Sequence, residues 1–329
     1  MWAYLLHLGS NLWVDRVVPG REQDYICFQP FLRCEAALWR ALTAALAASG
    51  ATAVLIDVAD GVRYDSHPEL AVRRAWSRPR LQRELARLRR LGLEPIPKLN
   101  FSTAHDAWLG PYGRMVSTDA YYAVCRDLIA ETIELFGRPS LFHLGMDEET
   151  AAHQQLYAYA VMRQHDLWWQ DLRFLVDQVE RGGSRAWVWS DYLWHHPDEY
   201  LRRMPRTVLQ SNWYYGASFS LDRRRNPAAA YVRAYLQLDA HGFDQVPTGS
   251  NHAHAGNFAA TVGFARRHLA PERLRGFLQT AWRPTQTVYR ERHLEAIAQL
   301  QAARTRAGAA RVPLRRRSPA AGRTRPACP

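Results

Sequence analysis

The stretch LFHLGMDEET, residues 141–150, joins an apolar run to three consecutive acidic residues, Asp147, Glu148 and Glu149. The apolar half is typical of a short buried strand, and the acids fall where such a strand would end. Successive side chains on a strand alternate between its two faces, so Asp147 would share a face with His143 and Glu148 would take the other. Both acids can reach one pocket only where the regular strand geometry stops.

The same pattern recurs along the chain. Short apolar runs that end in polar residues alternate with longer segments of helical periodicity, most of which stop at a glycine. The runs are residues 4–10, 53–60, 94–101, 140–148, 185–191, 207–213, 244–250 and 275–282. Repeated strand–helix units predict an α/β fold with a parallel sheet. Eight of them predict a single-domain (β/α)8 TIM barrel, which we place over residues 1–303.

Composition favours one large domain followed by a basic tail. The chain has 329 residues, of which 47% are hydrophobic, enough to bury a large core. Its net charge of +12 comes almost entirely from arginine, with Lys98 the only lysine. Residues 304–329 carry eight arginines and no acidic residue, which predicts a disordered tail. Because no aromatic residue interleaves these arginines, we expect no nucleic-acid partner.

Signals for export, membrane insertion and metal binding are missing from the sequence. The first segment lacks a basic leader and a small-residue cleavage site, and no stretch is long enough to span a membrane. We therefore expect a cytoplasmic protein without a membrane partner. The four cysteines have no CxxC spacing, so we expect neither a metal nor a cofactor. No pattern decides the oligomeric state.

In a barrel of this kind the functional groups lie at the carboxyl ends of the strands. Here those positions are mostly carboxylates, amides and tryptophans. They are Asn11 and Trp13, Asp57 and Asp60, Asn100 and His105, Asp147 and Glu148, Trp189 and Asp191, Asn212 and Trp213, Ser250 and Asn251, and Trp282. Tryptophan faces stack on the C–H face of a pyranose, and Asp and Asn side chains hydrogen-bond its hydroxyls. The sequence therefore predicts a carbohydrate substrate.

The three adjacent acids also indicate acid–base chemistry. Ionising all three so close together is unfavourable, which raises the pKa of one of them and suits it to act as a general acid. Acids at this place can instead cap a helix that begins near Thr150, because the amino end of a helix attracts negative charge. We expect this capping role for Glu149.

Residues 143–148, HLGMDE, resemble the H-x-G-G-D-E motif of the family 20 glycoside hydrolases, the β-N-acetylhexosaminidases. In that family the motif ends the fourth barrel strand, as it does in the barrel predicted here. Trp189 after the fifth strand, Trp213 after the sixth and Trp282 after the eighth extend the resemblance over residues 1–300.

The resemblance implies a substrate-assisted, retaining mechanism without an enzyme nucleophile. Asp147 would orient the acetamido group of the substrate, whose oxygen attacks the anomeric carbon. Glu148 would protonate the leaving oxygen and then deprotonate water. His105 and Asp60 would support Glu148 through hydrogen bonds, and His143 would lie beneath Asp147.

The resemblance also implies a set of residues that bind the sugar. Three tryptophans would wall the pocket, and further side chains would contact the substrate. The set is Trp189, Trp213, Trp282, Asp191, Asn100, Asn251 and Tyr215, with Tyr214 as the alternative to Tyr215. The chain departs from the family pattern at Met146, which replaces a glycine, at Lys98, and at Pro284, where relatives have a sugar-binding glutamate.

Two other functions fit the same residues. A non-catalytic carbohydrate-binding barrel would keep the tryptophan pocket without turnover. A glycosidase acting on a sugar without an acetamido group would pair Glu148 with Asp191 or Asp60, the two carboxyls lying roughly 5 Å apart. A metal site at His252 and His254 ranks below both.

Overall fold

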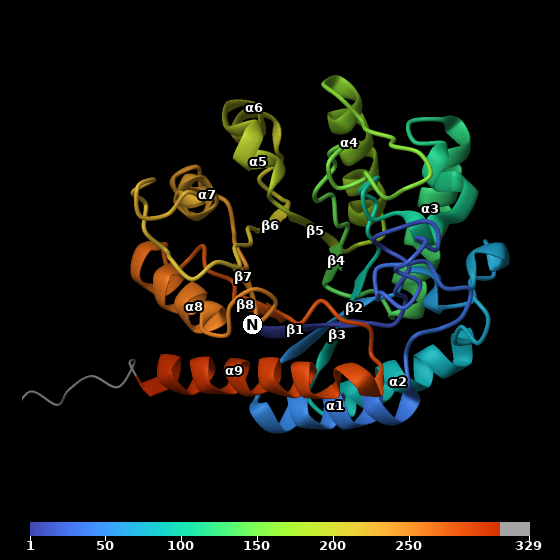
Figure 1. Cartoon of the computed structure of the whole chain (residues 1–329), viewed down its shortest axis with the longest axis horizontal. Helices are drawn as coiled ribbons and strands as arrows, with labels where there is room; N and C mark the ends of the chain where they lie inside the picture. The colour runs from blue at the N-terminus through green and yellow to red at the C-terminus, as the bar shows by residue number, and fades with distance from the viewer. Residues whose placement is uncertain (310–329) are drawn as a thin grey trace, which may run out of the picture.

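The computed structural model describes residues 1–309 and contains eight parallel strands with helices arranged around them (Figure 1). The strands are β1 (Trp2–His7), β2 (Ala53–Asp57), β3 (Glu94–Lys98), β4 (Leu141–His143), β5 (Arg185–Trp189), β6 (Leu209–Ser211), β7 (Thr248–Ser250) and β8 (Phe277–Thr280). Each overlaps one of the eight apolar runs, so the predicted α/β fold, a (β/α)8 barrel in one domain, is confirmed.

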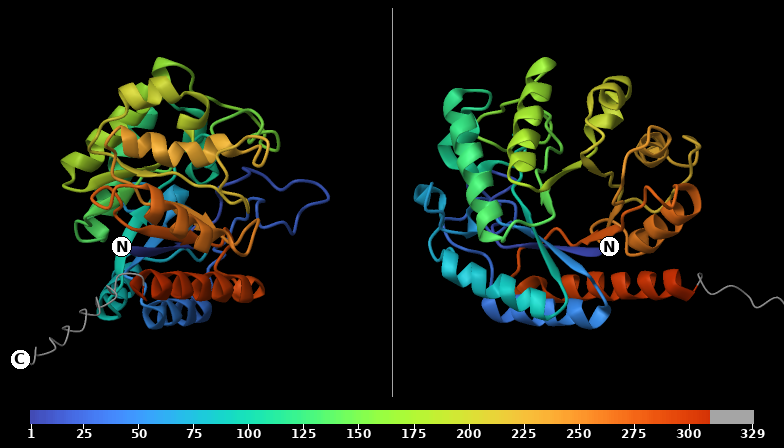
Figure 2. Two further views of the ribbon diagram at one scale, coloured as in Figure 1. Left: turned by 90° about the vertical axis from the view of Figure 1, so that its left-hand side faces the viewer. Right: turned by 180° about the vertical axis from the view of Figure 1, so that it is seen from behind.

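Helices follow the strands as their periodicity predicts. They are α1 (Ala36–Ser49), α2 (Arg78–Arg90), α3 (Asp119–Leu135), α4 (Asp166–Arg181), α5 (Tyr192–His195), α6 (Pro197–Arg203), α7 (Ala229–Ala240), α8 (Asn257–His268) and α9 (Arg290–Ala309). Gly50 ends α1 with φ 79°, a left-handed conformation that suits glycine. The long loop between β1 and α1 stands out from the body of the barrel in Figure 2, coloured dark blue.

Side chains of the strands alternate between the barrel interior and the helix layer. Ala3 and Leu5 of β1 belong to the interior cluster, whereas Tyr4 and Leu6 pack among the side chains of the helix layer. The same alternation turns the last residues of several strands inward. Lys98 of β3 is one of them, and it forms a buried ion pair with Asp57 of β2. The cation at position 98 is therefore neutralised inside the barrel.

The barrel closes between β6 and β7 by hydrogen bonds that each join a residue of one short strand to a residue just outside the other. The sheet order is β6-β5-β4-β3-β2-β1-β8-β7, so these two strands form its edges. The Val246 amide donates to the Gln210 carbonyl over 2.8 Å, and the Thr248 amide donates to the Asn212 carbonyl over 3.0 Å. These bonds bring the loops that follow β6 and β7 to one end of the barrel.

The carboxyl-terminal boundary differs from the prediction. Helix α9 continues to Ala309, so residues 304–309 are helical and not part of a tail. The remainder of the predicted basic tail lies outside the described residues. Among the helices of the described part, none has both the length and the apolar character needed to cross a membrane.

Candidate active site

A turn after β4 brings Asp147 and Glu148 to one cavity. Strand β4 ends at His143, and the backbone is then left-handed at Gly145, Met146 and Glu148, with φ of 73°, 74° and 56°. The Nδ1 atom of His143 accepts a hydrogen bond of 3.0 Å from the Gly145 amide and so supports the first residue of this turn. The strand alternation that would separate the two acids is thereby broken.

The two acids open onto a cavity of about 250 Å³, here called the acid cavity. It is lined by Trp13, Tyr25, His105, Asp147, Glu148, Trp213, Tyr215, His252 and Trp282. These residues come from the loops after β1, β3, β4, β6, β7 and β8. The cavity therefore lies at the carboxyl end of the barrel, where the active sites of this architecture are found.

Asn100 holds Asp147 in place. Its Nδ2 atom donates to Asp147 Oδ1 over 2.8 Å, and its Oδ1 atom accepts from the amides of Met146 at 3.2 Å and Ser102 at 3.1 Å. Both ends of the amide are thus used within the protein. The structure places Asn100 behind Asp147, which differs from the predicted contact with the sugar.

Two histidines flank Glu148. The Nε2 atom of His105 lies 3.2 Å from Glu148 Oε2 and 3.5 Å from Asp147 Oδ2, and the Nε2 atom of His153 lies 3.3 Å from Glu148 Oε1. Burial acts to raise the pKa of Glu148, but the hydrogen bonds and charges of His105 and His153 outweigh it and hold this pKa well below its usual range. The expectation that clustering raises the pKa of an acid in the trio is therefore wrong for Glu148.

His105 carries the opposite shift. Burial lowers its pKa, but the charge of Asp147 and the contact with Glu148 dominate and raise the pKa of His105 to about 9. The His105 and Glu148 side chains therefore share one proton at neutral pH, and that proton resides mainly on the imidazole. His153, which sequence reasoning missed, lies five residues after Glu148 and belongs to no strand end.

Asp191 lies next to Glu148, and its pKa is raised. Its Oδ2 atom accepts a hydrogen bond of 2.8 Å from the Glu148 amide, and its Oδ1 atom accepts one of 3.3 Å from Trp213 Nε1. Burial and the nearby charge of Asp147 raise the pKa of Asp191 to about 8. Asp191 thus connects the acid turn to the aromatic wall as a carboxylic acid that is mostly neutral at pH 7.

Trp213, Tyr215 and Trp282 form an aromatic wall of the acid cavity. The rings of Trp213 and Tyr215 are stacked with centroids 5.0 Å apart, and Tyr215 and Trp282 lie 6.5 Å apart. The Tyr215 hydroxyl and the Trp282 indole nitrogen are both shielded from solvent. Burial raises the pKa of Tyr215, and the Trp282 side chain, which lies within hydrogen-bonding reach of the hydroxyl, acts in the opposite direction. The Tyr214 hydroxyl instead bonds to Asn226.

Trp189 does not reach the cavity, contrary to the predicted wall. It is 1% exposed and packs in the barrel interior, with its ring centroid 4.4 Å from His143 and 5.8 Å from Trp282. Its position at the end of β5 turns it inward, so it supports Trp282 from below. His143 likewise packs against Trp189, and no hydrogen bond joins it to Asp147 in the described part of the chain.

Two further predicted residues lie elsewhere. Asp60 accepts a hydrogen bond of 2.6 Å from Asn11, and burial raises its pKa to about 7. It forms no bond to His105 within the described residues, so the predicted relay from Asp60 is not present. Asn251 donates to Glu295 over 2.8 Å and to the Arg292 carbonyl over 3.0 Å, which directs it toward α9 and not into the cavity.

Glu149 binds Arg163 and does not cap a helix. The first helix after the acids is α4, which starts at Asp166, so the helix expected near Thr150 is absent there. Glu149 is joined to the Arg163 guanidinium by contacts of 2.9 and 2.6 Å, and Arg163 also reaches Asp171 of α4 over 3.2 Å. This buried network ties the acid turn to α4.

The described residues contain one group of side chains that could bind a metal ion. Ligand atoms of His105, Asp147 and Glu148 all lie within 4.8 Å of one another. A protonated His105 between two carboxylates accounts for the same geometry without an ion. His252 and His254 belong to no group of three such side chains in residues 1–309.

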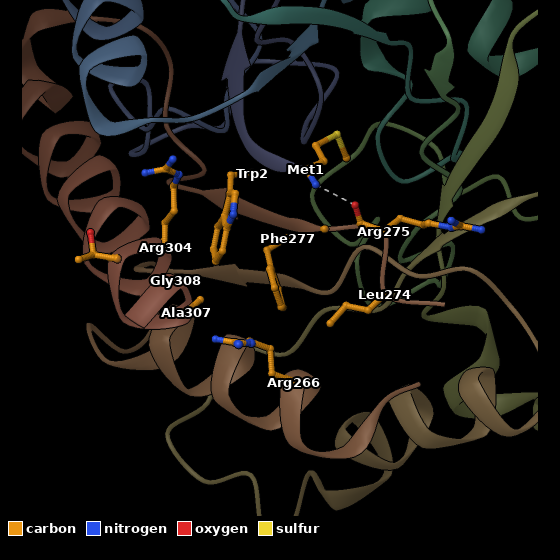
Figure 3. A pocket seen from close by; sticks show the side chains of 11 residues that line it. Met1, Trp2, Arg266, Leu274, Arg275, Phe277, Arg304, Ala307 and Gly308 are labelled. Carbon is orange, nitrogen blue, oxygen red and sulfur yellow. Dashed lines mark hydrogen bonds between the residues drawn. The ribbon is translucent and has the colours of Figure 1, made fainter. Parts of the chain in front are cut away.

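Other cavities lie apart from this site or border it. A cavity of about 170 Å³ shares Glu148 and Trp213 with the acid cavity and is also lined by His153 and Trp194. Figure 3 shows another, of about 520 Å³, at the amino end of the barrel between β1, β8, α8 and α9. Arg266 and Arg304 line it, and it contains none of the predicted site residues.

The fold of this chain is similar to that of several solved hexosaminidase structures. A β-N-acetylhexosaminidase from Bacteroides fragilis superposes with a TM-score of 0.60 at 12% identity, covering 91% of this chain and 65% of that one. A family 20 (GH20) β-N-acetylhexosaminidase from Streptomyces coelicolor gives 0.59 at 12% identity, covering 91% and 64%. A GH20 exo-β-N-acetylglucosaminidase from Vibrio harveyi, solved with N-acetylglucosamine, gives 0.56 at 10% identity, covering 94% and 57%.

These similarities show that the chain has the fold of the family 20 β-N-acetylhexosaminidases. It spans less than two thirds of the length of those proteins. Neither a family model nor a curated protein sequence matches the chain.

Proposed function

We propose that the protein is a glycoside hydrolase that removes a β-linked N-acetylhexosamine by a substrate-assisted, retaining mechanism. The observation that carries the proposal is the turn after β4, which directs two adjacent acids with different partners into one aromatic cavity. Asp147 is held by a neutral amide and Glu148 by two histidines, so the two carboxyls are prepared for different tasks.

Asp147 would hold the acetamido group of the substrate. Fixed by Asn100 on one oxygen, it can accept the acetamido N–H on the other. The Tyr215 hydroxyl and the Trp282 N–H, whose side chains line the cavity, would bind the acetamido carbonyl oxygen. Fixing both ends of the group would place its oxygen for attack on the anomeric carbon, and Asp147 would stabilise the positive charge that develops.

Glu148 would transfer the proton. As the acetamido oxygen bonds to the anomeric carbon, the glycosidic bond breaks and its electron pair goes to the leaving oxygen. Glu148 gives that oxygen a proton, which reaches Oε2 from His105 Nε2 over 3.2 Å. A water molecule then gives a proton to Glu148 and attacks the anomeric carbon. The bond from that carbon to the acetamido oxygen breaks, its electron pair returns to the acetamido group, and the sugar leaves with retained configuration.

The electrostatics argue against a two-carboxylate mechanism. A nucleophile has to be ionised, yet burial and Asp147 raise the pKa of Asp191 to about 8. Asp60 has a pKa raised to about 7 by burial and is bonded to Asn11. Neither acid is well suited to act as an anionic nucleophile at neutral pH.

Release of fluorophore from 4-methylumbelliferyl N-acetyl-β-glucosaminide tests the proposal. We expect Glu148→Gln and Asp147→Asn each to lower kcat by about 10² to 10⁴, the usual contribution of an acid–base group, and a thiazoline analogue of the intermediate to inhibit the wild type. Glu272→Gln, at an exposed residue without an ion pair in the described structure, is the matched control and should keep wild-type activity. Unchanged turnover by Glu148→Gln would refute the proposal. Thiazoline binding without turnover would indicate a carbohydrate-binding barrel.

A further inference from the structure

The cavity of about 520 Å³ at the amino end of the barrel has an aromatic and aliphatic lining (Figure 3). Trp2 is the first residue of β1 and Phe277 the first of β8, and their ring centroids lie 5.0 Å apart. Leu274, which precedes β8, and Ala307 of α9 extend the apolar surface. Small-molecule sites have this size and this kind of lining. The cavity lies at the end of the barrel opposite the acid cavity, so it serves a ligand other than the sugar.

The same cavity is basic. Figure 3 shows Arg266 of α8 and Arg304 of α9 on opposite sides of Trp2 and Phe277. A third arginine of the lining, Arg275, precedes β8. No aspartate or glutamate of residues 1–309 lines this cavity. An occupant therefore meets apolar surface and positive charge together.

Arg266 carries the positive charge that the protein leaves without compensation. Arg275 forms an ion pair of 2.9 Å with Asp244. Arg304 Nη1 lies 2.6 Å from where a Cβ on Gly50 would stand, at the carboxyl end of α1, and the carboxyl end of a helix attracts cations. The partly buried Arg266 has neither an ion pair nor a hydrogen bond within the described part of the chain.

A second cavity, of about 360 Å³, continues the surface between α8 and α9. It shares Arg266 and Ala307 with the first cavity, and Val262 of α8 and Ala303 of α9 add apolar side chains to it. Arg266 thus stands where the two cavities meet. A ligand whose charged group binds Arg266 has apolar surface on both sides for the rest of its length.

We infer that this site binds a carboxylate with an apolar chain, of the fatty-acid type, with the carboxylate on Arg266 and the chain against Trp2 and Phe277. A planar guanidinium donates two parallel hydrogen bonds to a carboxylate. One uncompensated guanidinium balances the single charge of a carboxylate, whereas a phosphate monoester carries nearly two charges at neutral pH. Residues 310–329 carry six arginines and no acidic residue, so their charge does not favour them as the occupant.

Calorimetric titration of the full chain with decanoate, 1-decanol, decyl phosphate and acetate tests the inference. We expect decanoate to bind about tenfold to hundredfold more tightly than decanol, the usual gain from a charge-assisted hydrogen bond. Acetate should not bind at comparable concentrations, because it lacks the chain whose burial contributes most of the affinity.

Three variants locate the site. Arg266→Gln should remove the advantage of decanoate over decanol and leave the affinity for decanol within about twofold. Ala307→Phe, which fills the space beside α9, should weaken both ligands by about tenfold or more. Arg181→Gln is the matched control, at an exposed arginine of α4, and should change neither affinity.

Each outcome supports the inference or overturns it. Equal affinities for decanoate and decanol, or an advantage of decanoate that survives Arg266→Gln, would overturn it. Tighter binding of decyl phosphate than of decanoate would assign the site to a phosphate and would also overturn it. If decanoate does not bind at all, the cavity has another occupant and the inference fails. None of these measurements involves turnover, so their results are independent of the proposed hydrolase activity.

Discussion

Replacing His105 by glutamine should move the alkaline limit of activity downward. His105 Nε2 lies 3.2 Å from Glu148 and 3.5 Å from Asp147. In the proposed mechanism it holds the proton that Glu148 passes to the leaving oxygen. Glutamine retains an N–H donor of similar reach but cannot carry this proton. In the variant the proton has to reside on Glu148 itself, which as a carboxyl group loses it at a lower pH than an imidazole between two acids.

The expected fall of the alkaline limit follows from the pKa of His105 in the wild type. The rise of the His105 pKa from its usual value of 6.5 to about 9 corresponds to roughly 3 kcal/mol in favour of the protonated ring. Because this pKa is raised, the wild type keeps its catalytic proton below about pH 9 and loses it as the pH rises through that value. An ordinary glutamate loses its proton near 4.3, and burial raises that value, so we expect the alkaline limit to fall by at least about two pH units.

The measurement is the pH dependence of kcat/KM, which reports groups of the free enzyme. His153→Gln is the matched control: His153 touches the other oxygen of Glu148 and is 46% exposed, so its loss should leave the alkaline limit near that of the wild type. Nitrogen-detected NMR of the His105 ring gives a reading that needs no turnover. An unchanged limit in His105→Gln, or a ring that loses its proton below pH 7 in the wild type, would show that the reasoning is wrong.

Two further substitutions test the framework of the site. Gly145→Ala should lower both activity and stability, because the added Cβ would fall on the amide oxygen of Asn100. Gly92 is the control: it has nearly the same φ as Gly145 but open space around it. Gly92→Ala should therefore show only the backbone penalty of about 1 kcal/mol. Arg163→Met should lower the free energy of unfolding, measured in urea, by about 3 to 5 kcal/mol, because it leaves the buried carboxylates of Glu149 and Asp171 without their cation. Arg126→Met, at the surface, is the control and should change that free energy by less than about 0.5 kcal/mol. Equal effects within either pair would contradict the corresponding interpretation.

The fold could be predicted from local sequence patterns because the barrel consists of repeated strand–helix units, each visible in a short stretch of sequence. The apolar runs and the helical periodicity with glycine stops are visible in the sequence, and each corresponds to an element of the structure. The expected end of the barrel at residue 303 was too early. Arginines in residues 304–309 suggested a tail by composition, but arginine is a good helix former and α9 continues through them.

The site was harder to predict because the direction of a side chain at a strand end depends on contacts far away in the sequence. Trp189 is the last residue of β5 and packs inward on His143, whereas Trp282 lies two residues after the end of β8, with a left-handed φ of 51°, and lines the cavity. Glu149 has its partner at Arg163, and no local pattern links the two.

If the proposed activity is present, the left-handed backbone at Glu148 also restricts how a lineage of such chains could lose it. Among the residues one base change away from glutamate, glycine and aspartate tolerate a positive φ, whereas valine, with its branched Cβ, does so poorly. Descendants that stopped hydrolysing sugars would therefore be expected to collect glycine or aspartate at position 148. Such chains would keep the barrel and the aromatic cavity, and could persist as lectins descended from an enzyme.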